Sequence, residues 1–203
     1  MMSRKTGSTH SYHRENLRRD LLEAGFSYVC EHGHDTLSVR TLASIVGVSS
    51  GAPYHHFADR RALLLALACD GYERLSGTGA DNLRVISDPL ERLRAISRHF
   101  LLFAHQYPRL FDLMYESELT RPQLDPLIKE AQLRGFALFR EAMVQAVPTI
   151  PEQDFATRIL SVWSTLFGFA MLRNKEIIKP YEMSQDIADS VVEYIIGMAA
   201  SVR

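Results

Sequence analysis

The stretch SVRTLASIVGVSSGAPYHHF, residues 38–57, decides the fold of this chain. Ser38 can accept a hydrogen bond at the start of a helix of only two turns. Leu42, Ile45 and Val46 then give this short helix an apolar face that can pack on a core. The stretch therefore begins with a small helix that depends on its neighbours for stability.

A tight turn follows the short helix. Ala43 is small where a second helix must cross closely, and Gly47 can adopt the positive φ that the turn needs. Val48 fills the inside of the turn, and Ser49 can cap the next helix. This order of small residue, glycine, apolar residue and hydroxyl is typical of a DNA-binding helix-turn-helix.

The second helix, expected over residues 50–57, has little side chain at its start, where it reads Ser50, Gly51, Ala52 and Pro53. Small side chains leave room for close approach to a major groove. Tyr54 and His55 carry polar tips that can reach phosphates, and Arg40 can reach a base edge or a phosphate from the preceding helix. The pattern predicts a surface that binds double-stranded DNA.

Charge and composition narrow the class of protein. The formal net charge is −1, yet the first 19 residues hold five Lys or Arg residues against Glu15 alone. A basic end on a nearly neutral protein suits a phosphate-contacting head on a body with another task. Hydrophobic residues make up 46%, enough for a core. We find neither a secretory signal nor an apolar run of about 18 residues, and we expect a soluble cytoplasmic protein with no membrane partner.

Apolar residues recur at spacings of three and four throughout, so we expect an all-α protein with about nine helices. They are expected over residues 13–32, 39–46, 50–57, 59–75, 88–107, 108–117, 122–147, 152–173 and 185–201. Asp88 before Pro89, Asp125 before Pro126, and Ser184 are the clearest helix starts. We expect residues 1–58 to form the DNA-binding domain, with a basic arm at 1–12. Residues 59–203 should form a ligand-binding and dimerisation domain.

Residues 38–67 contain Thr-Leu-Ala, Gly-Val-Ser, Tyr-His-His-Phe and Arg-Arg-Ala-Leu-Leu, and resemble the DNA-binding head of the TetR family of bacterial regulators. The resemblance implies that the third helix reads DNA and that Arg60, in place of the family's usual lysine, contacts phosphate. Pro53 stands where leucine or isoleucine is commoner, which leaves the pose of that helix open. The predicted DNA-binding residues are Arg40, Ser49, Ser50, Ala52, Pro53, Tyr54, His55 and Arg60.

Large adaptable side chains in the middle of the chain predict a cavity for a mainly apolar ligand of unknown identity. The predicted ligand-binding residues are Phe103, Tyr107, Phe111, Met114, Tyr115, Phe139, Trp163 and Phe167. Polar groups that could orient such a ligand are Arg98, His99, His105, Arg134 and Arg140. Each of these polar residues can equally belong to a solvated helix face.

The last two helices carry apolar stripes that predict a homodimer built as a four-helix bundle. The predicted interface residues are Leu166, Ala170, Ile187, Val191, Tyr194, Ile195 and Met198. A dimer also suits a palindromic operator, because two heads can read two half-sites. The alternative is that both stripes pack within one chain.

We therefore interpret the chain as a ligand-responsive transcriptional regulator, with repression as the default action that the resemblance implies. An activator, or a DNA-binding protein that answers to no ligand, remains possible on this pattern. A helical small-molecule or partner-binding protein without DNA affinity is a further alternative. We find no catalytic motif and expect no cofactor. We also expect no metal site, because the side chains of the adjacent His55 and His56 diverge by about 100° on a helix and cannot bind one ion together.

Overall fold

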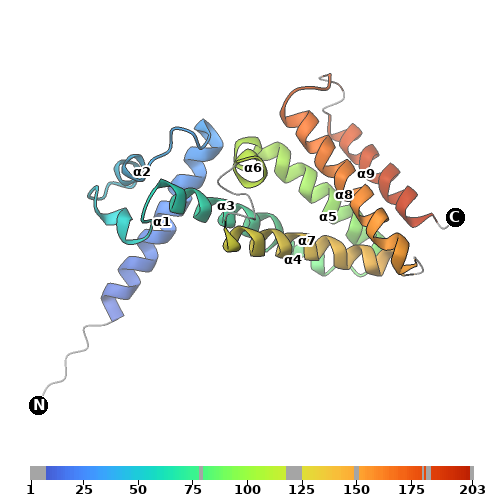
Figure 1. The fold of residues 1–203 in the computed structure, drawn as a ribbon, viewed down its shortest axis with the longest axis horizontal. Coiled ribbons are helices and arrows are strands. Elements are labelled where there is room, and N and C mark those ends of the chain that lie inside the picture. The colour runs from blue at the N-terminus through green and yellow to red at the C-terminus, as the bar shows by residue number, and fades with distance from the viewer. Residues whose placement is uncertain are drawn as a thin grey trace, which may run out of the picture. The chain divides into compact units, whose positions relative to one another are not determined.

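The structure is a computed structural model, and it describes residues 8–77, 80–117, 125–148, 151–179, 181 and 184–201. Side chains within these ranges are described from residue 16 onward, except at residue 152. The described residues form nine α-helices and one short 3₁₀-helix, η1, and contain no strand (Figure 1). The predicted all-α fold is confirmed.

The chain divides into two compact units. The first unit comprises Met1–Gly71 and Arg109–Ile128, and the second comprises Tyr72–Pro108 and Lys129–Arg203. The division falls within α3 (Arg60–Ser76), so this helix contributes residues to both units. The functional boundary near Asp59 stays a prediction.

The first unit contains α1 (Ser8–His32), α2 (Val39–Val46), η1 (Ala52–His55), the first part of α3 and most of α6 (Pro108–Tyr115). Its core includes the buried side chains of Leu21, Val29, Leu37, Leu42, Phe57, Leu63, Leu64 and Leu67. Helices α1 and α3 approach closely at Gly25, where a Cβ atom would lie 2.9 Å from Cδ2 of Leu67. A larger residue at position 25 would therefore force the buried side chain of Leu67 to move.

The apolar face of α2 differs from the predicted one. Val39, Leu42 and Ala43 are its buried residues, whereas Ile45 is 51% exposed. An α-helix turns by about 100° per residue, which places Ile45 about 120° around the axis from Val39. The prediction that Ile45 belongs to the buried face is wrong for this reason.

The second unit contains the last part of α3, α4 (Asp81–Arg84), α5 (Pro89–Gln106), most of α7 (Pro126–Ala146), α8 (Glu152–Asn174) and α9 (Gln185–Ala200). Helices α5, α8 and α9 pack against one another. Two predicted helix caps are confirmed. Asp88 Oδ1 accepts the backbone N–H of Glu91 at 2.8 Å, and Ser184 Oγ accepts that of Ile187 at 3.3 Å. The short α4 was not predicted, and the predicted start of α7 at residue 122 lies outside the described residues.

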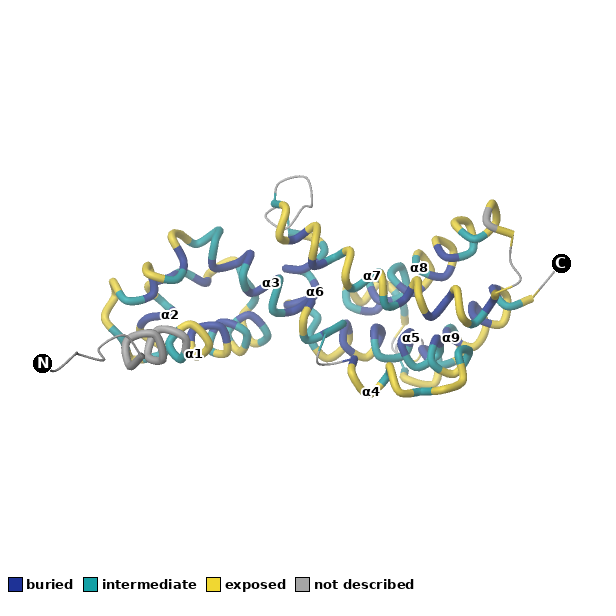
Figure 2. Tube along the Cα trace, turned by 90° about the horizontal axis from the view of Figure 1, so that it is seen from below, coloured by how far each residue is buried: buried dark blue, intermediate teal, exposed yellow. Residues whose placement is uncertain are grey.

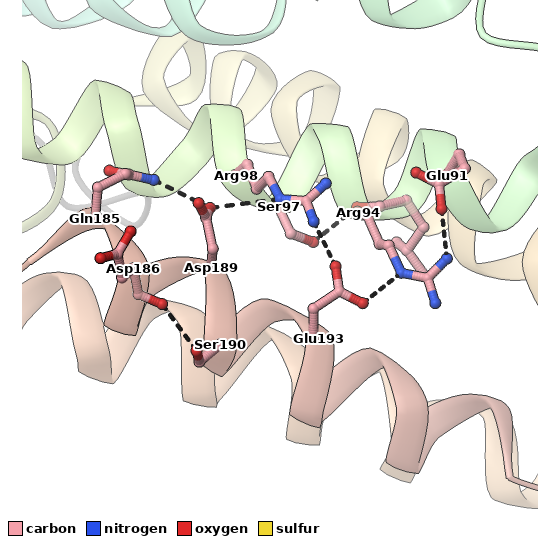
Figure 3. Close-up of polar contacts among 10 residues, drawn as sticks. Glu91, Arg94, Ser97, Arg98, Gln185, Asp186, Asp189, Ser190 and Glu193 are labelled. Carbon is pink, nitrogen blue, oxygen red and sulfur yellow. Dashed lines mark hydrogen bonds and ion pairs between the residues drawn. The ribbon is translucent and has the colours of Figure 1, made fainter.

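A ladder of charged side chains joins α5 to α9 on their outer faces (Figure 3). Arg94 Nε lies 2.9 Å from Glu193 Oε2, and Arg94 Nη1 lies 2.8 Å from Glu91 Oε1. Arg98 pairs with Glu193 as well, and its Nε lies 3.4 Å from Asp189 Oδ1. Glu193 therefore bridges two arginines of α5 and fixes the register of α9 on it.

Helix α8 exposes more apolar surface than a core helix normally does. Its segment Gln153–Asn174 is, within the described residues, the one helical stretch long and apolar enough to cross a membrane by length and composition, and only 22% of its most apolar window is buried. Figure 2 shows buried and exposed stretches alternating along α8 and α9. An apolar helix face left in water in this way favours burial against another molecule.

Candidate DNA interface and ligand region

Helix α2 and the turn after it are fixed by local hydrogen bonds. Ser38 Oγ accepts the backbone N–H of Thr41 at 3.0 Å, as its predicted cap role requires. Gly47 adopts φ +76°, and Val48 N–H donates to the Ala43 carbonyl at 3.0 Å. A side chain at position 47 would be strained in this left-handed conformation. The cap and the turn of the predicted helix-turn-helix therefore form as expected.

The second half is shorter than predicted and is a 3₁₀-helix. Element η1 begins at Ala52, with Gly51 at its N-cap and no side-chain capping bond, so the prediction that Ser49 caps it is wrong. Pro53 lies in its first turn and has no N–H to donate. Tyr54 N–H donates to the Gly51 carbonyl at 3.2 Å, the i→i+3 bond of a 3₁₀-helix. Four residues of tight helix thus stand where eight residues of helix were expected.

The outer surface of this segment is small and polar. Arg40, Ser49, Ser50, Gly51 and His55 are exposed, and Tyr54 is 45% exposed. Ala52 is half-buried and Pro53 is buried, so the side chain of Pro53 faces the core of the unit. Arg40 and His55 supply basic or weakly basic groups on this surface. The two serines and Tyr54 supply hydroxyls, and Gly51 leaves its backbone uncovered. Such a surface can donate hydrogen bonds to phosphates and admit close approach of a duplex.

Arg60, predicted to contact phosphate, is engaged within the protein. Its Nε donates to the Leu37 carbonyl at 2.8 Å, and its Nη2 donates to the carbonyls of His34 and Asp35 at 2.7 and 2.8 Å. All three carbonyls lie in the connection between α1 and α2. The guanidinium therefore joins the start of α3 to the chain segment that leads into the helix-turn-helix.

The predicted ligand residues divide between the two units. Phe111, Met114 and Tyr115 belong to the first unit, where Phe111 and Met114 are completely buried. The second unit holds Phe103, Tyr107, Phe139, Trp163 and Phe167. There the Trp163 ring lies 4.9 Å from the ring of Phe100 and 5.6 Å from that of Phe139, measured between centroids. These rings form a continuous aromatic cluster among α5, α7 and α8.

A cavity of about 490 Å³ lies elsewhere in the second unit. Residues of α3, α4 and α7 line it, and none of them belongs to the predicted ligand set: Tyr72, Glu73, Ser76, Gly77, Asp81, Arg84, Ala131, Arg134, Ala137, Leu138 and Glu141. Arg134, one of the predicted polar orienting residues, is exposed and pairs with Glu130 at 2.8 Å. The lining mixes acids and bases on exposed side chains, which gives it no single preferred charge.

One charged residue that the sequence did not single out is buried in the second unit. Arg173 of α8 is 5% exposed, and its Nε and Nη1 atoms have no hydrogen-bond partner in the described residues. Burial lowers the pKa of Arg173. His105 near the end of α5 is exposed overall, yet partial burial of its ring and, secondly, the charge on Arg173 lower the pKa of His105. Buried guanidinium groups are normally paired, so Arg173 is exceptional.

The predicted dimer residues fall into two sets. Leu166, Ala170 and Ile195 are buried within one chain, at 0%, 2% and 8% exposure. Tyr194 and Met198 are 71% and 56% exposed, and Ile187 and Val191 are half-buried. The first set packs α8 and α9 on their own unit and has little area left for a partner. The second set forms an outward stripe along α9.

Comparisons with known proteins match the N-terminal and C-terminal parts of the chain to two different family models. Residues 21–67 match the family model of bacterial regulatory proteins of the tetR family, and residues 93–198 match the tetracyclin repressor-like C-terminal domain. The HTH-type transcriptional repressor AcnR of Corynebacterium efficiens is 39% identical over 67 residues, which cover 33% of this chain and 36% of that protein. The matched part thus spans about a third of the first curated relatives.

Solved structures extend the likeness to the whole chain. A Rhodococcus sp. RHA1 protein of unknown function is 30% identical, with a TM-score of 0.73 over 91% of this chain and 93% of that one. AibR, solved in complex with isovaleryl coenzyme A and operator DNA, shares the fold at 21% identity, with a TM-score of 0.62 over 89% and 96% of the two chains. Since the C-terminal family model alone covers more than half of its 203 residues, the chain belongs to the TetR family of bacterial regulators.

Proposed function

We propose that this chain is a dimeric, DNA-binding transcription regulator, and that an effector held in the second unit releases it from a palindromic operator. Repression is the action we propose, since the similar protein AcnR is described as a transcriptional repressor. We further propose that the protein acts in the cytoplasm and without catalytic turnover. The observation that carries the proposal is the small, polar, exposed surface of α2 and η1, held rigid by the Ser38 cap and the Gly47 turn.

Specific residues receive roles on this surface. The proposed contacts to phosphate are made by Tyr54, His55 and Arg40, because their polar tips are exposed. Ser49 and Ser50 face the bases, where short side chains let the backbone approach the groove edge. Pro53 acts from within the core, by shaping η1. Arg60 positions the segment rather than binding DNA through its Nε and Nη2 atoms.

The proposed dimer uses the exposed faces of α8 and α9. Leu160 is 56% exposed on α8, and Tyr194 and Met198 are 71% and 56% exposed on α9. A two-fold contact between two copies would bury both stripes and would pair two DNA-binding heads. Half-sites one helical turn apart require heads about 34 Å apart. An effector that changes this spacing would release DNA, which is the switch we propose.

A gel shift with DNA from the chain's own upstream region tests the proposal. We expect a specific complex whose affinity falls steeply between 50 and 200 mM salt, as phosphate contacts demand. Tyr54→Ala should weaken binding to all sequences alike, whereas Tyr181→Ala, which removes an exposed tyrosine in the second unit, should not. No shift with the wild-type protein would favour a helical binding protein without DNA affinity. A changed base preference in Tyr54→Ala would contradict the phosphate role.

Light scattering tests the dimer. Tyr194→Asp combined with Met198→Asp places two charges on the exposed stripe and should yield monomers. Leu133→Asp, at a residue 58% exposed on α7, is the matched control and should leave the dimer intact. A dimer that survives the double substitution would place the interface elsewhere.

A further inference from the structure

Helix α8 carries a charge where its sequence pattern calls for an apolar residue. Ile159, Val162, Leu166 and Ala170 recur at spacings of three and four and are all buried, with exposures of at most 5%. Arg173 continues this stripe by one more step and is equally buried. A residue on this face packs toward the core of the second unit, so a guanidinium here enters an apolar environment.

The described residues offer no acceptor to two of the three nitrogens of this guanidinium. Nε and Nη1 of Arg173 are both fully enclosed and both unpaired. The neighbouring Asn174 donates from its Nδ2 to the Ala104 carbonyl at 3.0 Å, which ties this end of α8 to α5. A buried charge without an acceptor is among the most costly features of a folded protein, which indicates that an acceptor belongs to the functional state.

We propose that Arg173 is the anchor for an anionic effector, a molecule with an apolar body and one carboxylate group. This inference rests on the proposed function and names the chemistry of its effector. The guanidinium matches a carboxylate in shape and charge, and the two form strong charge-assisted hydrogen bonds.

The charge balance of the region favours a carboxylate over a phosphate. Burial and, secondly, the charge on Arg173 lower the pKa of His105 and favour its neutral form, so the positive charge of this pair lies mainly on Arg173. A carboxylate has one negative charge, whereas a phosphate monoester has about 1.5 to 2 at this pH. A monoanion is therefore neutralised here and a dianion is not.

Aromatic side chains of the same unit can pack against the apolar body of the effector. Asn174, next to Arg173, bonds the last turn of α5 at Ala104, and the Phe103 ring lies 5.2 Å from that of Tyr107 in that turn. Further along α5 and α8 is the aromatic cluster around Trp163. A carboxylate held at Arg173 would leave the rest of the molecule against these rings, where apolar surface is favourably buried.

Trp163 is the only tryptophan of the chain, so its fluorescence reports binding directly. The probes are sodium decanoate and 3-phenylpropionate, each compared with its own amide, and inorganic phosphate alone. For the wild-type dimer we expect at least one carboxylate to bind about ten-fold or more tightly than its amide, the strength of a charge-assisted bond. Arg173→Met should reduce this preference to about two-fold or less. Arg173→Lys should keep part of it, and Lys129→Met, at an exposed residue of α7, should keep all of it.

Five results would overturn the inference: equal binding of acid and amide by the wild type, an unchanged preference in a folded Arg173→Met, loss of selectivity in Lys129→Met, a phosphate effect equal to that of the carboxylates, or no carboxylate binding at all. The comparison of acid with amide on the wild type needs no variant, so it stands even if Arg173→Met does not fold. A gel shift on the same preparations distinguishes failure of the effector inference from failure of the proposed function. A DNA complex that no carboxylate affects overturns the effector alone, and the absence of any DNA complex overturns the proposed function.

Discussion

Arg60 in the first compact unit donates three hydrogen bonds to backbone carbonyls, whereas Arg173 in the second donates none from Nε or Nη1 to any described residue. Arg60 is half-buried and lies at the start of a helix, and Arg173 is buried near the end of one. The same side chain therefore meets three backbone acceptors in one unit, whereas in the other two of its nitrogens are buried without an acceptor.

From this difference we infer that Arg60 has a structural role and that Arg173 can bind a ligand. Three carbonyls satisfy the N–H donors on Nε and Nη2 of Arg60, so a phosphate would gain little from these atoms. The guanidinium of Arg173 is desolvated and its Nε and Nη1 atoms have no acceptor. A hydrogen bond from these atoms to a ligand is therefore strongly favourable in free energy. Stability measurements can distinguish the two cases, because removal of a satisfied group and removal of an unsatisfied group change the free energy of unfolding in opposite directions.

Arg60→Ala should give the largest loss of stability. Three carbonyls would lose a charged donor, two of them in partly buried bonds, and we expect the free energy of unfolding to fall by about 2–3 kcal/mol in urea denaturation. Arg60→Lys should recover only part of this, since an ammonium group cannot reproduce the planar fork.

Arg61→Ala is the matched control for Arg60. Arg61 is the next residue of α3, is 42% exposed and lies 3.5 Å from Asp125, so its loss should cost less than about 1 kcal/mol. If Arg60→Ala kept its stability but lost DNA affinity across all sequences, Arg60 would be the phosphate contact that the sequence predicted.

Arg173→Met should change stability in the opposite direction. In the absence of carboxylate we expect the free energy of unfolding to rise by about 1–3 kcal/mol, because an apolar side chain of similar length removes an unpaired buried charge. Arg158→Met on the same helix is the control, since Arg158 Nη1 donates to the carbonyls of Ala199 and Ser201, both at 2.8 Å. That variant should lose stability. A loss in Arg173→Met as well would mean that Arg173 already has an acceptor within this chain.

Local signals predicted the parts of the fold that local bonds determine. The Ser38, Asp88 and Ser184 caps and the Gly47 turn all form as expected, because each depends on residues within a few positions of itself. The pose of the second DNA-binding helix did not follow from such signals. A proline in its first turn was recognised, but whether the chain continues as an α-helix or tightens to η1 depends on how Pro53 packs into the core.

Periodicity predicted apolar stripes, but it does not say which molecule covers them. On α9 the predicted dimer set contains both Ile195, which is buried in its own chain, and Tyr194, which is 71% exposed. Arg173 was missed because charged residues are assigned to the surface by default. Its place in the stripe of Leu166 and Ala170 was visible in the spacing, and a charge at a core position of an apolar stripe is the signal that could have revealed it.

Glu193→Gln should give a smaller effect than Arg60→Ala or Arg173→Met, and it extends the comparison to arginines that are paired at the surface. Glu193 is 46% exposed and bridges Arg94 and Arg98 on α5 (Figure 3). Solvent screens such pairs, so we expect a loss of about 0.5–1 kcal/mol at 20 mM salt that largely disappears at 1 M salt. Glu130→Gln, which breaks one pair with Arg134 within α7, should lose about half as much or less. A loss at 1 M salt as large as that of Arg60→Ala would show that the ladder holds α9 by geometry rather than by charge, and burial would then not be what distinguishes these arginines.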